Sequence, residues 1–232
     1  MLDFIKDWYV LIILLTISFV FTFLWLFLNR SKLSFRWWEC LLYSFFFIIF
    51  GVCSVRFFAV MEAGFQLERA GNLSLFGGIF FLSIYYLILS LIKHVPIRKM
   101  FDFFTIPLIV TLLLARTNCY LSGCCYGKLI GNTSFRYPTR EFELLFDSLL
   151  LVFMIPWVYQ EKSQGRAYPV YMIAYGLFRF LNEFMRYSET DRIFHIAHLW
   201  SIVSILIGIS FLLYPYISEK KITPNEGESH AE

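Results

Sequence analysis

Charged residues are scarce in this chain. They make up 16% of its 232 residues, whereas soluble domains usually carry about 25%. Hydrophobic residues account for 59% of the sequence and aromatic residues for 21%, more than a soluble fold of this length can bury. The composition therefore excludes an ordinary soluble domain and predicts a protein that crosses a membrane several times.

Three further features are missing. The net charge is only +3, without a basic stripe, which argues against a nucleic-acid partner. The first ten residues contain two acids, and no small A-x-A-like site follows the first apolar run, so we expect an anchor and not a cleaved signal peptide. Because no repeat or separate soluble domain is visible, we expect one membrane domain over 1–217 and a polar cytoplasmic tail over 218–232.

Long apolar runs, in contrast, are abundant. A spanning helix needs about 20 apolar residues, and these runs are too long and too uniformly apolar for the strands of a barrel. The predicted fold is therefore all-α, a polytopic membrane protein with about seven transmembrane helices. The fifth span is the weakest because Asp147 and Pro156 interrupt it. The predicted spans are about 8–28, 38–60, 72–93, 102–122, 143–160, 167–186 and 196–216.

Basic residues indicate the orientation in the membrane. Clean basic clusters lie on one side of it, at 30–36, 93–99, 162–166 and 220–221. On the other side the cations are mixed with acids such as Glu62 and Glu141. Since cytoplasmic loops carry the excess of Lys and Arg, we predict the N-terminus outside and the C-terminus in the cytoplasm, with the end of the fourth span at the outer face.

Ionisable side chains in the fourth and sixth spans need a reason, because each costs at least about 2.5 kcal/mol to insert and usually serves a purpose. Arg116, late in the fourth span, either binds an anion or extends to the lipid head groups. Polar residues of the sixth span fall on one helical face: Tyr175, Arg179, Asn182, Glu183 and Arg186. Such a stripe favours a functional cavity over a single structural ion pair.

Two arginines inside the spans suggest a receptor for an anion. Guanidinium groups form planar, multidentate hydrogen bonds that suit phosphate, and the obvious anion in a membrane is a phospholipid head group. Arg56, at the end of the second span, is either a third contact or an interfacial residue. Gly77, Gly78 and Gly123 permit close approach of the backbone to a ligand, and tight helix packing is the alternative.

These features together resemble the prolipoprotein diacylglyceryl transferase family. The stretch GRAYPVYMIAYGLFRFLNEFMR is similar to the family pattern Tyr-Gly-x-x-Arg-x-x-x-Glu-x-x-Arg, with matches at Tyr175, Gly176, Arg179, Glu183 and Arg186. The stretch from Arg116 keeps the frame of a second motif at Tyr120, Gly123, Gly127 and Lys128, and YPTREFE aligns Pro138 and Glu143 with a third. Weaker matches are WYV at Trp8–Tyr9, SVRFF around Arg56 and AHLWS near the end.

The resemblance implies a seven-helix protein of the bacterial inner membrane with its N-terminus outside. It also implies an activity, the transfer of a diacylglyceryl group from phosphatidylglycerol to the lipobox cysteine thiol of an exported preprolipoprotein. Two arginines hold the phosphate in this reaction, and glycerol phosphate leaves. No cofactor or metal is part of this prediction.

Several positions depart from the family pattern. Phe76 stands where the family has a histidine, Cys119 replaces an asparagine, and Cys124 replaces a glutamate. His198 occupies a glutamine position of the last motif. The alternatives to the family reaction are a divergent member with another acceptor and a non-catalytic lipid-binding or thiol-redox membrane protein.

Three cysteines cluster near Arg116, at Cys119, Cys124 and Cys125. They are compatible with a disulfide, with a catalytic thiolate beside a cation, with a metal site that includes His195 or His198, or with neutral replacement. The metal interpretation is the weakest because C-x4-C-C is not a zinc spacing and adjacent ligands are awkward.

The resemblance and the polar stripe together assign roles. Arg116 and Arg179 bind the phosphate and stabilise charge on the departing glycerol phosphate, and Glu183 and Tyr175 orient Arg179. The remaining predicted contacts of the head group are Tyr9, Arg56, Gly77, Gly78, Gly123, Glu143 and Arg186. The candidates for the proton acceptor are His198, Glu143 and a thiolate at Cys119 or Cys124.

Overall fold

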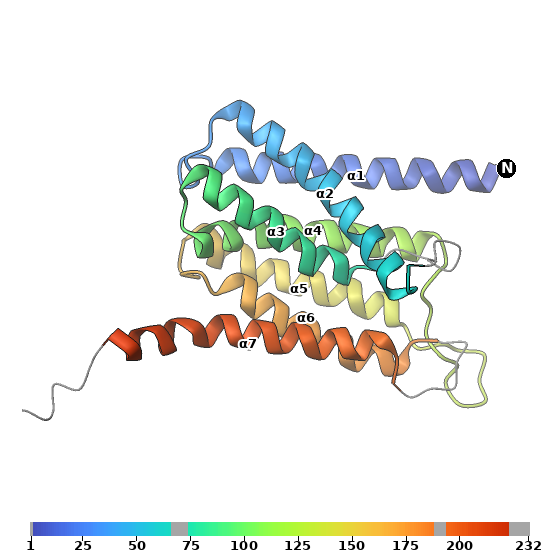
Figure 1. The fold of residues 1–232 in the computed structure, drawn as a ribbon. Helices are drawn as coiled ribbons and strands as arrows, with labels where there is room; N and C mark the ends of the chain where they lie inside the picture. Colours follow the sequence, from blue (N-terminus) through green and yellow to red (C-terminus); the bar gives the residue numbers. More distant parts are fainter. Residues whose placement is uncertain (1, 66–73, 188–193, 223–232) are drawn as a thin grey trace, which may run out of the picture.

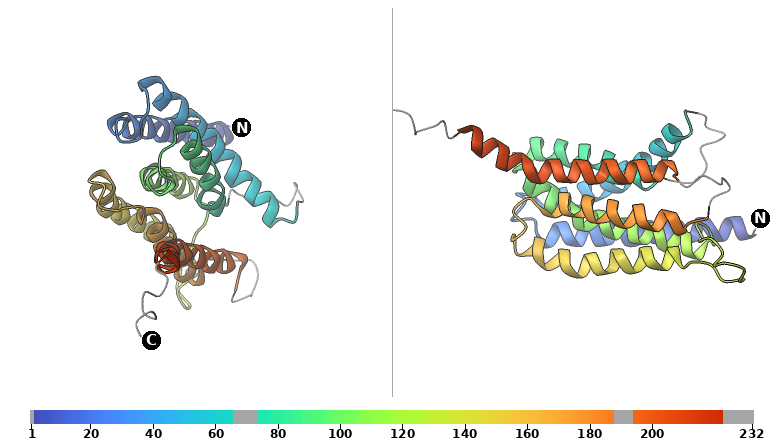
Figure 2. Two further views of the ribbon diagram at one scale, coloured as in Figure 1. Left: turned by 60° about the vertical axis from the view of Figure 1, so that its left-hand side comes forward. Right: turned by 90° about the horizontal axis from the view of Figure 1, so that it is seen from below.

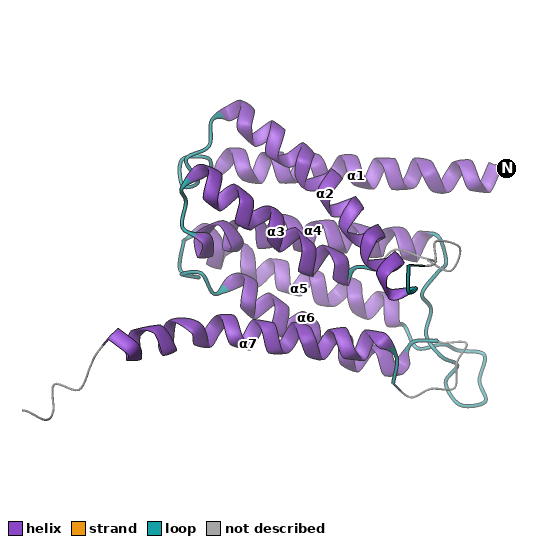
Figure 3. Cartoon of the chain, in the orientation of Figure 1, coloured by secondary structure: helices purple, strands orange, loops and turns teal. Residues whose placement is uncertain are grey.

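The computed structural model describes residues 2–65, 74–187 and 194–222, with side chains over 9–65, 74–187 and 194–213. These residues form seven α-helices and no strand (Figures 1 and 3). Their bounds are α1 Leu2–Leu28, α2 Trp37–Glu62, α3 Phe76–Lys93, α4 Ile97–Leu121, α5 Thr139–Tyr159, α6 Ala167–Met185 and α7 Ile196–Ile222. The predicted all-α fold is confirmed.

Six of these helices are long and apolar enough to cross a membrane. The seventh is α6, whose polar stripe of Tyr175, Arg179, Asn182 and Glu183 lowers its mean hydropathy. The weakly predicted fifth span is a continuous helix, although it contains Pro156 and the buried Asp147. The protein is therefore a polytopic membrane protein, as predicted. Helix α6 is the one least suited to be surrounded by lipid on all sides.

Helix α4 lies at the centre of the bundle. It contacts α1, α3, α5 and α6, and Figure 2 shows it between the α1–α3 group and the α5–α7 group. Over an apolar 18-residue window, 72% of α4 is buried inside the protein, against 22% for the corresponding windows of α1 and α5. A residue on α4 can therefore meet partners from several helices, whichever side it faces.

The connections between helices fall at two ends of the bundle (Figure 3). The described N-terminal end of α1 lies at the same end as the α4–α5 connection, which carries the cysteines (Figure 1). Four helices, α1 to α4, separate these two points, and an even number of crossings returns the chain to the same end. The side that faces the cytoplasm stays a prediction, and residues 223–232 of the predicted tail lie outside the described residues.

Gly77 brings α3 into close contact with α2. A Cβ atom on Gly77 would lie 2.4 Å from the Ser54 carbonyl oxygen and 2.8 Å from the Val55 Cα atom. A Cβ atom on Gly78 would meet only ordinary contacts, the nearest at 3.6 Å. For Gly77 the structure supports the packing alternative over contact with a ligand.

Candidate functional site

Four buried charged residues form one continuous chain of ion pairs, which we call the ion chain: Arg116, Glu143, Arg179 and Glu183. The two Glu143 oxygens accept from different arginines, Oε2 from Arg116 Nε at 2.8 Å and Oε1 from Arg179 Nη1 at 2.6 Å. Arg179 Nη2 lies 2.6 Å from Glu183 Oε2. Every side chain in the chain is at most 10% exposed, so these charges are paired inside the protein.

Three helices hold the ion chain in place. Arg116 comes from α4, Glu143 from α5, and the other two from successive turns of α6. Asn182, next to Glu183, donates to Glu143 Oε1 at 3.1 Å and to the carbonyl oxygen of Thr139 at 3.2 Å. Tyr175, one turn before Arg179, is the hydrogen-bond partner of Arg116 Nη2 at 3.4 Å. The polar stripe predicted on the sixth span is thus the face that α6 turns toward α4 and α5.

The ion chain forms one wall of a cavity of about 570 Å³. Arg116, Tyr175, Arg179 and Glu183 all line it, together with the three clustered cysteines and Glu62. A second, strongly apolar cavity lies between α1, α2, α3 and α4. The two share four lining residues: Leu11, Leu75, Ala115 and Asn118. A polar chamber therefore adjoins an apolar one.

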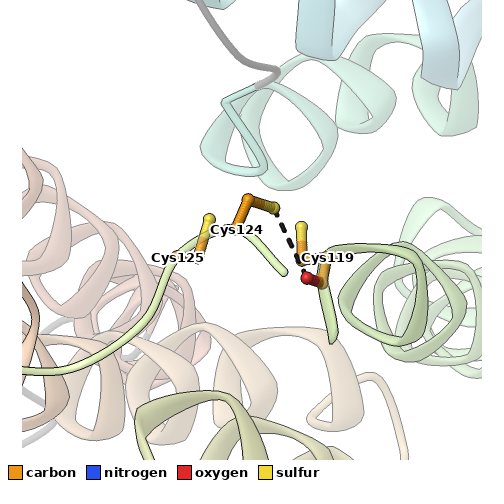
Figure 4. Close-up of side chains that lie close together, drawn as sticks. All are labelled: Cys119, Cys124 and Cys125. Atoms are coloured by element: carbon orange, nitrogen blue, oxygen red, sulfur yellow. Dashed lines mark hydrogen bonds between the residues drawn. The ribbon is translucent and has the colours of Figure 1, made fainter. Parts of the chain in front are cut away.

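The other polar wall is a cluster of three cysteines, which we call the thiol cluster: Cys119, Cys124 and Cys125 (Figure 4). Their sulfur atoms lie within 4.8 Å of one another, and all three are free thiols. The neighbouring thiols of Cys119 and Cys124, together with the charge of Arg186, lower the pKa of the Cys125 thiol well below its usual value. The Arg186 guanidinium Nη2 lies 2.8 Å from the Cys125 sulfur.

Backbone contacts hold one turn against the end of α6, and this turn carries the thiol cluster. Gly127 pairs with Arg186 in an isolated antiparallel bridge, and the Lys128 amide donates to the Met185 carbonyl at 2.8 Å. Gly123 and Cys125 both adopt positive φ, at 68° and 60°. Gly123 thus shapes the turn and is exposed there, outside the residues that line the cavity.

Comparison with known proteins decides the family. The family model for prolipoprotein diacylglyceryl transferase matches residues 3–214, nearly the whole chain. The chain belongs to the prolipoprotein diacylglyceryl transferase family.

Individual members of this family are distant relatives. The phosphatidylglycerol–prolipoprotein diacylglyceryl transferase of Clostridium tetani is 28% identical over 133 residues, which are 50% of this chain and 53% of that protein. The transferase of the same name from Clostridium kluyveri is 26% identical over 166 residues, 63% of this chain and 64% of that protein. A Helicobacter pylori relative is 27% identical over 45% of this chain and 38% of its own. The chain thus spans about half the length of several relatives that it matches.

The contacts of His198 in this family member are those of a residue that caps a helix and packs against aromatic rings. Its Nδ1 atom accepts from the backbone amide of His195 at 3.0 Å, which is the reciprocal half of a capping box at the start of α7. Its ring packs against Phe180, Phe184 and Phe194. His195, and not His198, lines the cavity. The structure therefore does not support His198 as the proton acceptor.

Glu143 is likewise poorly suited to accept a proton, because each of its oxygens is bonded to an arginine. Arg186, predicted to contact the head group, does line the cavity. Tyr9 is 64% exposed, and neither it nor the exposed Arg56 is among the lining residues. The fold thus places most of the predicted site residues at the cavity or in the ion chain. A smaller group lies away from both.

Phe76 and Glu62 also line the cavity. Phe76, at the position where the family pattern has a histidine, packs edge-on against Tyr175 with ring centroids 5.8 Å apart. Glu62 ends α2 and lines the cavity with Phe76. Sequence reasoning treated Glu62 as a loop residue because it ends an apolar run, and nothing in its spacing connects it with the sixth span.

Proposed function

We propose that this family member transfers a diacylglyceryl group from phosphatidylglycerol to a cysteine thiol of a prolipoprotein. The observation that carries the proposal is the ion chain, whose two arginines are fixed by one carboxylate at the wall of a cavity inside a membrane protein. The relatives bear the name of this reaction. The arginines, the tyrosine and the glycine-bounded turn of the family motifs are all present.

Phosphate recognition follows from the balance of charge. Counting Arg186, whose Nη1 lies 4.0 Å from Glu183 Oε2, the bonded groups comprise three guanidinium groups and two carboxylates. Each guanidinium carries five N–H donors, so Arg116 retains donors beyond those that meet Glu143 and Tyr175. A phosphate diester that enters the cavity meets donors whose geometry is already fixed.

The adjoining apolar cavity accounts for the rest of the lipid. Leucine, valine and isoleucine side chains line most of it, and Ser18, Thr111 and Asn118 are its polar lining residues. A head group in the polar chamber would leave acyl chains in apolar surroundings, as the hydrophobic effect requires. A ligand that binds only as a free phosphate would make no use of this second cavity.

In the proposed reaction the acceptor sulfur attacks the glyceryl carbon that bears the phosphate oxygen. A carbon–sulfur bond forms, the carbon–oxygen bond breaks, and its electron pair leaves with glycerol phosphate. Arg116 and Arg179 stabilise the charge that develops on the departing oxygen. The thiol proton goes to a carboxylate, and we assign this role to Glu62, which lines the cavity on α2 and forms no ion pair among the described residues.

A transfer assay with the purified chain tests the proposal. The chain is mixed with phosphatidylglycerol vesicles and a lipobox peptide that contains one cysteine, and mass spectrometry follows the peptide while glycerol phosphate is measured. We expect a thioether-linked diacylglyceryl peptide and one glycerol phosphate for each, with none from phosphatidylethanolamine or from a Cys→Ser peptide. Glycerol phosphate without modified peptide would indicate another acceptor. If folded protein yields neither product, the proposed transfer is refuted.

A further inference from the structure

The thiol cluster offers three sulfur ligands to one point in space. Its sulfurs lie within 4.8 Å of one another, although the sequence spacing argued against a shared site. With a metal–sulfur distance of about 2.3 Å, the sulfurs of a tetrahedral zinc site lie about 3.8 Å apart. The sulfurs are thus at most about 1 Å further apart than this spacing.

Backbone geometry explains how two adjacent cysteines can face the same point. In extended or helical backbone, neighbouring side chains diverge. Cys125 instead has φ of 60°, a conformation uncommon for a residue with a Cβ atom, and the preceding turn contains Gly123 at 68°. Cys119 closes the group from the last turn of α4, where its carbonyl accepts from the Cys124 sulfur at 3.5 Å.

The surroundings of the cluster suit a group with net negative charge. Three thiolates around a divalent cation carry one excess negative charge, and Arg186 Nη2 already lies 2.8 Å from the Cys125 sulfur. Arg186 is itself fixed by the bridge to Gly127. This is the kind of outer partner that orients a metal ligand. A disulfide, in contrast, would use two sulfurs and leave the third thiol in the same pocket.

We propose that Cys119, Cys124 and Cys125 bind one thiophilic d¹⁰ cation, best matched by Zn²⁺. Thiolates select Zn²⁺ or Cu⁺ over hard cations such as Mg²⁺ and Ca²⁺. All three cysteines line the polar cavity, so the fourth coordination position opens into it, where water or another thiol can bind. Three protein ligands with one open position is the arrangement of catalytic, and not of structural, zinc sites. The proposal does not depend on the transfer reaction.

Cobalt titration of the metal-free chain tests the site directly. The full-length protein is purified in detergent with reductant and chelator, the chelator is removed, and Co²⁺ is added anaerobically. We expect one equivalent of Co²⁺ per chain to give a thiolate-to-cobalt charge-transfer band that one equivalent of Zn²⁺ abolishes. Cys119→Ser, Cys124→Ser and Cys125→Ser should each weaken binding by more than the roughly 10–100-fold that loss of an outer partner causes.

Cys53→Ser is the matched control, because Cys53 is an exposed cysteine on α2, outside the cluster. It should leave the band unchanged. In the wild-type chain, Zn²⁺ should protect only the three clustered thiols from alkylation, as peptide mapping would show even if a variant failed to fold. Absence of the band, an equal band in the Cys119→Ser variant, or no protection by Zn²⁺ would overturn the proposal. Transfer activity that survives in a chain shown to lack the metal would leave the proposed function intact and restrict the site to binding.

Discussion

The ion chain and the thiol cluster face the same cavity but are held in different ways. The ion chain is assembled from three helices, and its side chains are at most 10% exposed. The thiol cluster lies where α4 gives way to a turn, and its members are only partly buried. The ion chain follows the family motifs, whereas the thiol cluster departs from them at two positions.

This difference indicates which of the two regions tolerates amino-acid substitution more readily. Buried charges that satisfy one another are costly to alter singly, because removal of one partner leaves the other unpaired. A turn at the end of a helix tolerates substitution more readily. Arg186 contacts both regions, through Glu183 and Cys125. Substitutions in the two regions, and at the residue between them, should therefore have separable effects.

The largest effect is expected from Glu143→Ala. This change leaves Arg116 and Arg179 without their shared carboxylate, and breaking such a buried pair costs about 3–5 kcal/mol of stability. Thermal unfolding in detergent, followed by circular dichroism, measures it. Glu141→Ala is the control, since Glu141 lies two residues earlier, in the first turn of α5, but is exposed. Equal unfolding temperatures for the two variants would contradict the account of the ion chain.

A smaller effect is expected from Gly77→Ala. Its new methyl group would meet the Ser54 carbonyl at 2.4 Å, and such overpacking costs about 1–3 kcal/mol. Gly78→Ala is the matched control, because its Cβ has space. Gly77→Ala should retain activity at a temperature where it is folded. A stable but inactive Gly77→Ala variant would instead place this glycine in the lipid site, beside the ion chain.

Arg186→Gln should cost about 1 kcal/mol, the typical net value of a hydrogen bond, since Arg186 is 24% exposed. Its specific consequence concerns the thiol cluster. Without the guanidinium, the pKa of Cys125 should rise, so that alkylation of Cys125 at neutral pH, measured with chelator present, becomes slower. Lys128→Gln removes an exposed cation from the same turn and should leave the rate unchanged. An unchanged rate in Arg186→Gln would show that the two regions are not coupled.

The smallest effect is expected from His198→Gln. Glutamine at this position can still accept from the His195 amide, as in a capping box, so stability should stay within about 0.5 kcal/mol of the wild type. His198→Ala should lose about 1 kcal/mol. Transfer activity should persist in both, measured on folded protein. An inactive yet stable His198→Gln variant would restore His198 as the proton acceptor.

Sequence reasoning located the ion chain but not its connections. The i,i+4 spacing of Tyr175, Arg179 and Glu183 predicts a polar face, and the structure shows that face. The role of Glu143 as the bridge between two arginines depends on where α5 packs, which no local spacing encodes. The resemblance aligned Glu143 with a family motif without specifying its partners.

For the thiol cluster, the sequence predicts the three members but not how their sulfur atoms are arranged. The three cysteines are expected to lie close together, but their spacing and the adjacency of Cys124 and Cys125 argue against a shared metal site. The positive φ at Cys125 is a property of the folded turn. His198 shows the converse case, since a histidine near a motif suggests a catalytic group, and only the folded structure shows that its ring packs among aromatic side chains.

One measurement tests the central claim most directly, that the ion chain of this family member serves diacylglyceryl transfer. The wild-type chain and Arg179→Lys are expressed in bacteria depleted of their own transferase, at equal membrane levels, and lipidation of preprolipoproteins is followed by mass spectrometry. We predict that the wild type restores lipidation and that Arg179→Lys does not, because an ammonium group cannot bridge Glu143 and Glu183 as the guanidinium does. Failure of the folded wild-type chain, or full rescue by Arg179→Lys, would contradict the account.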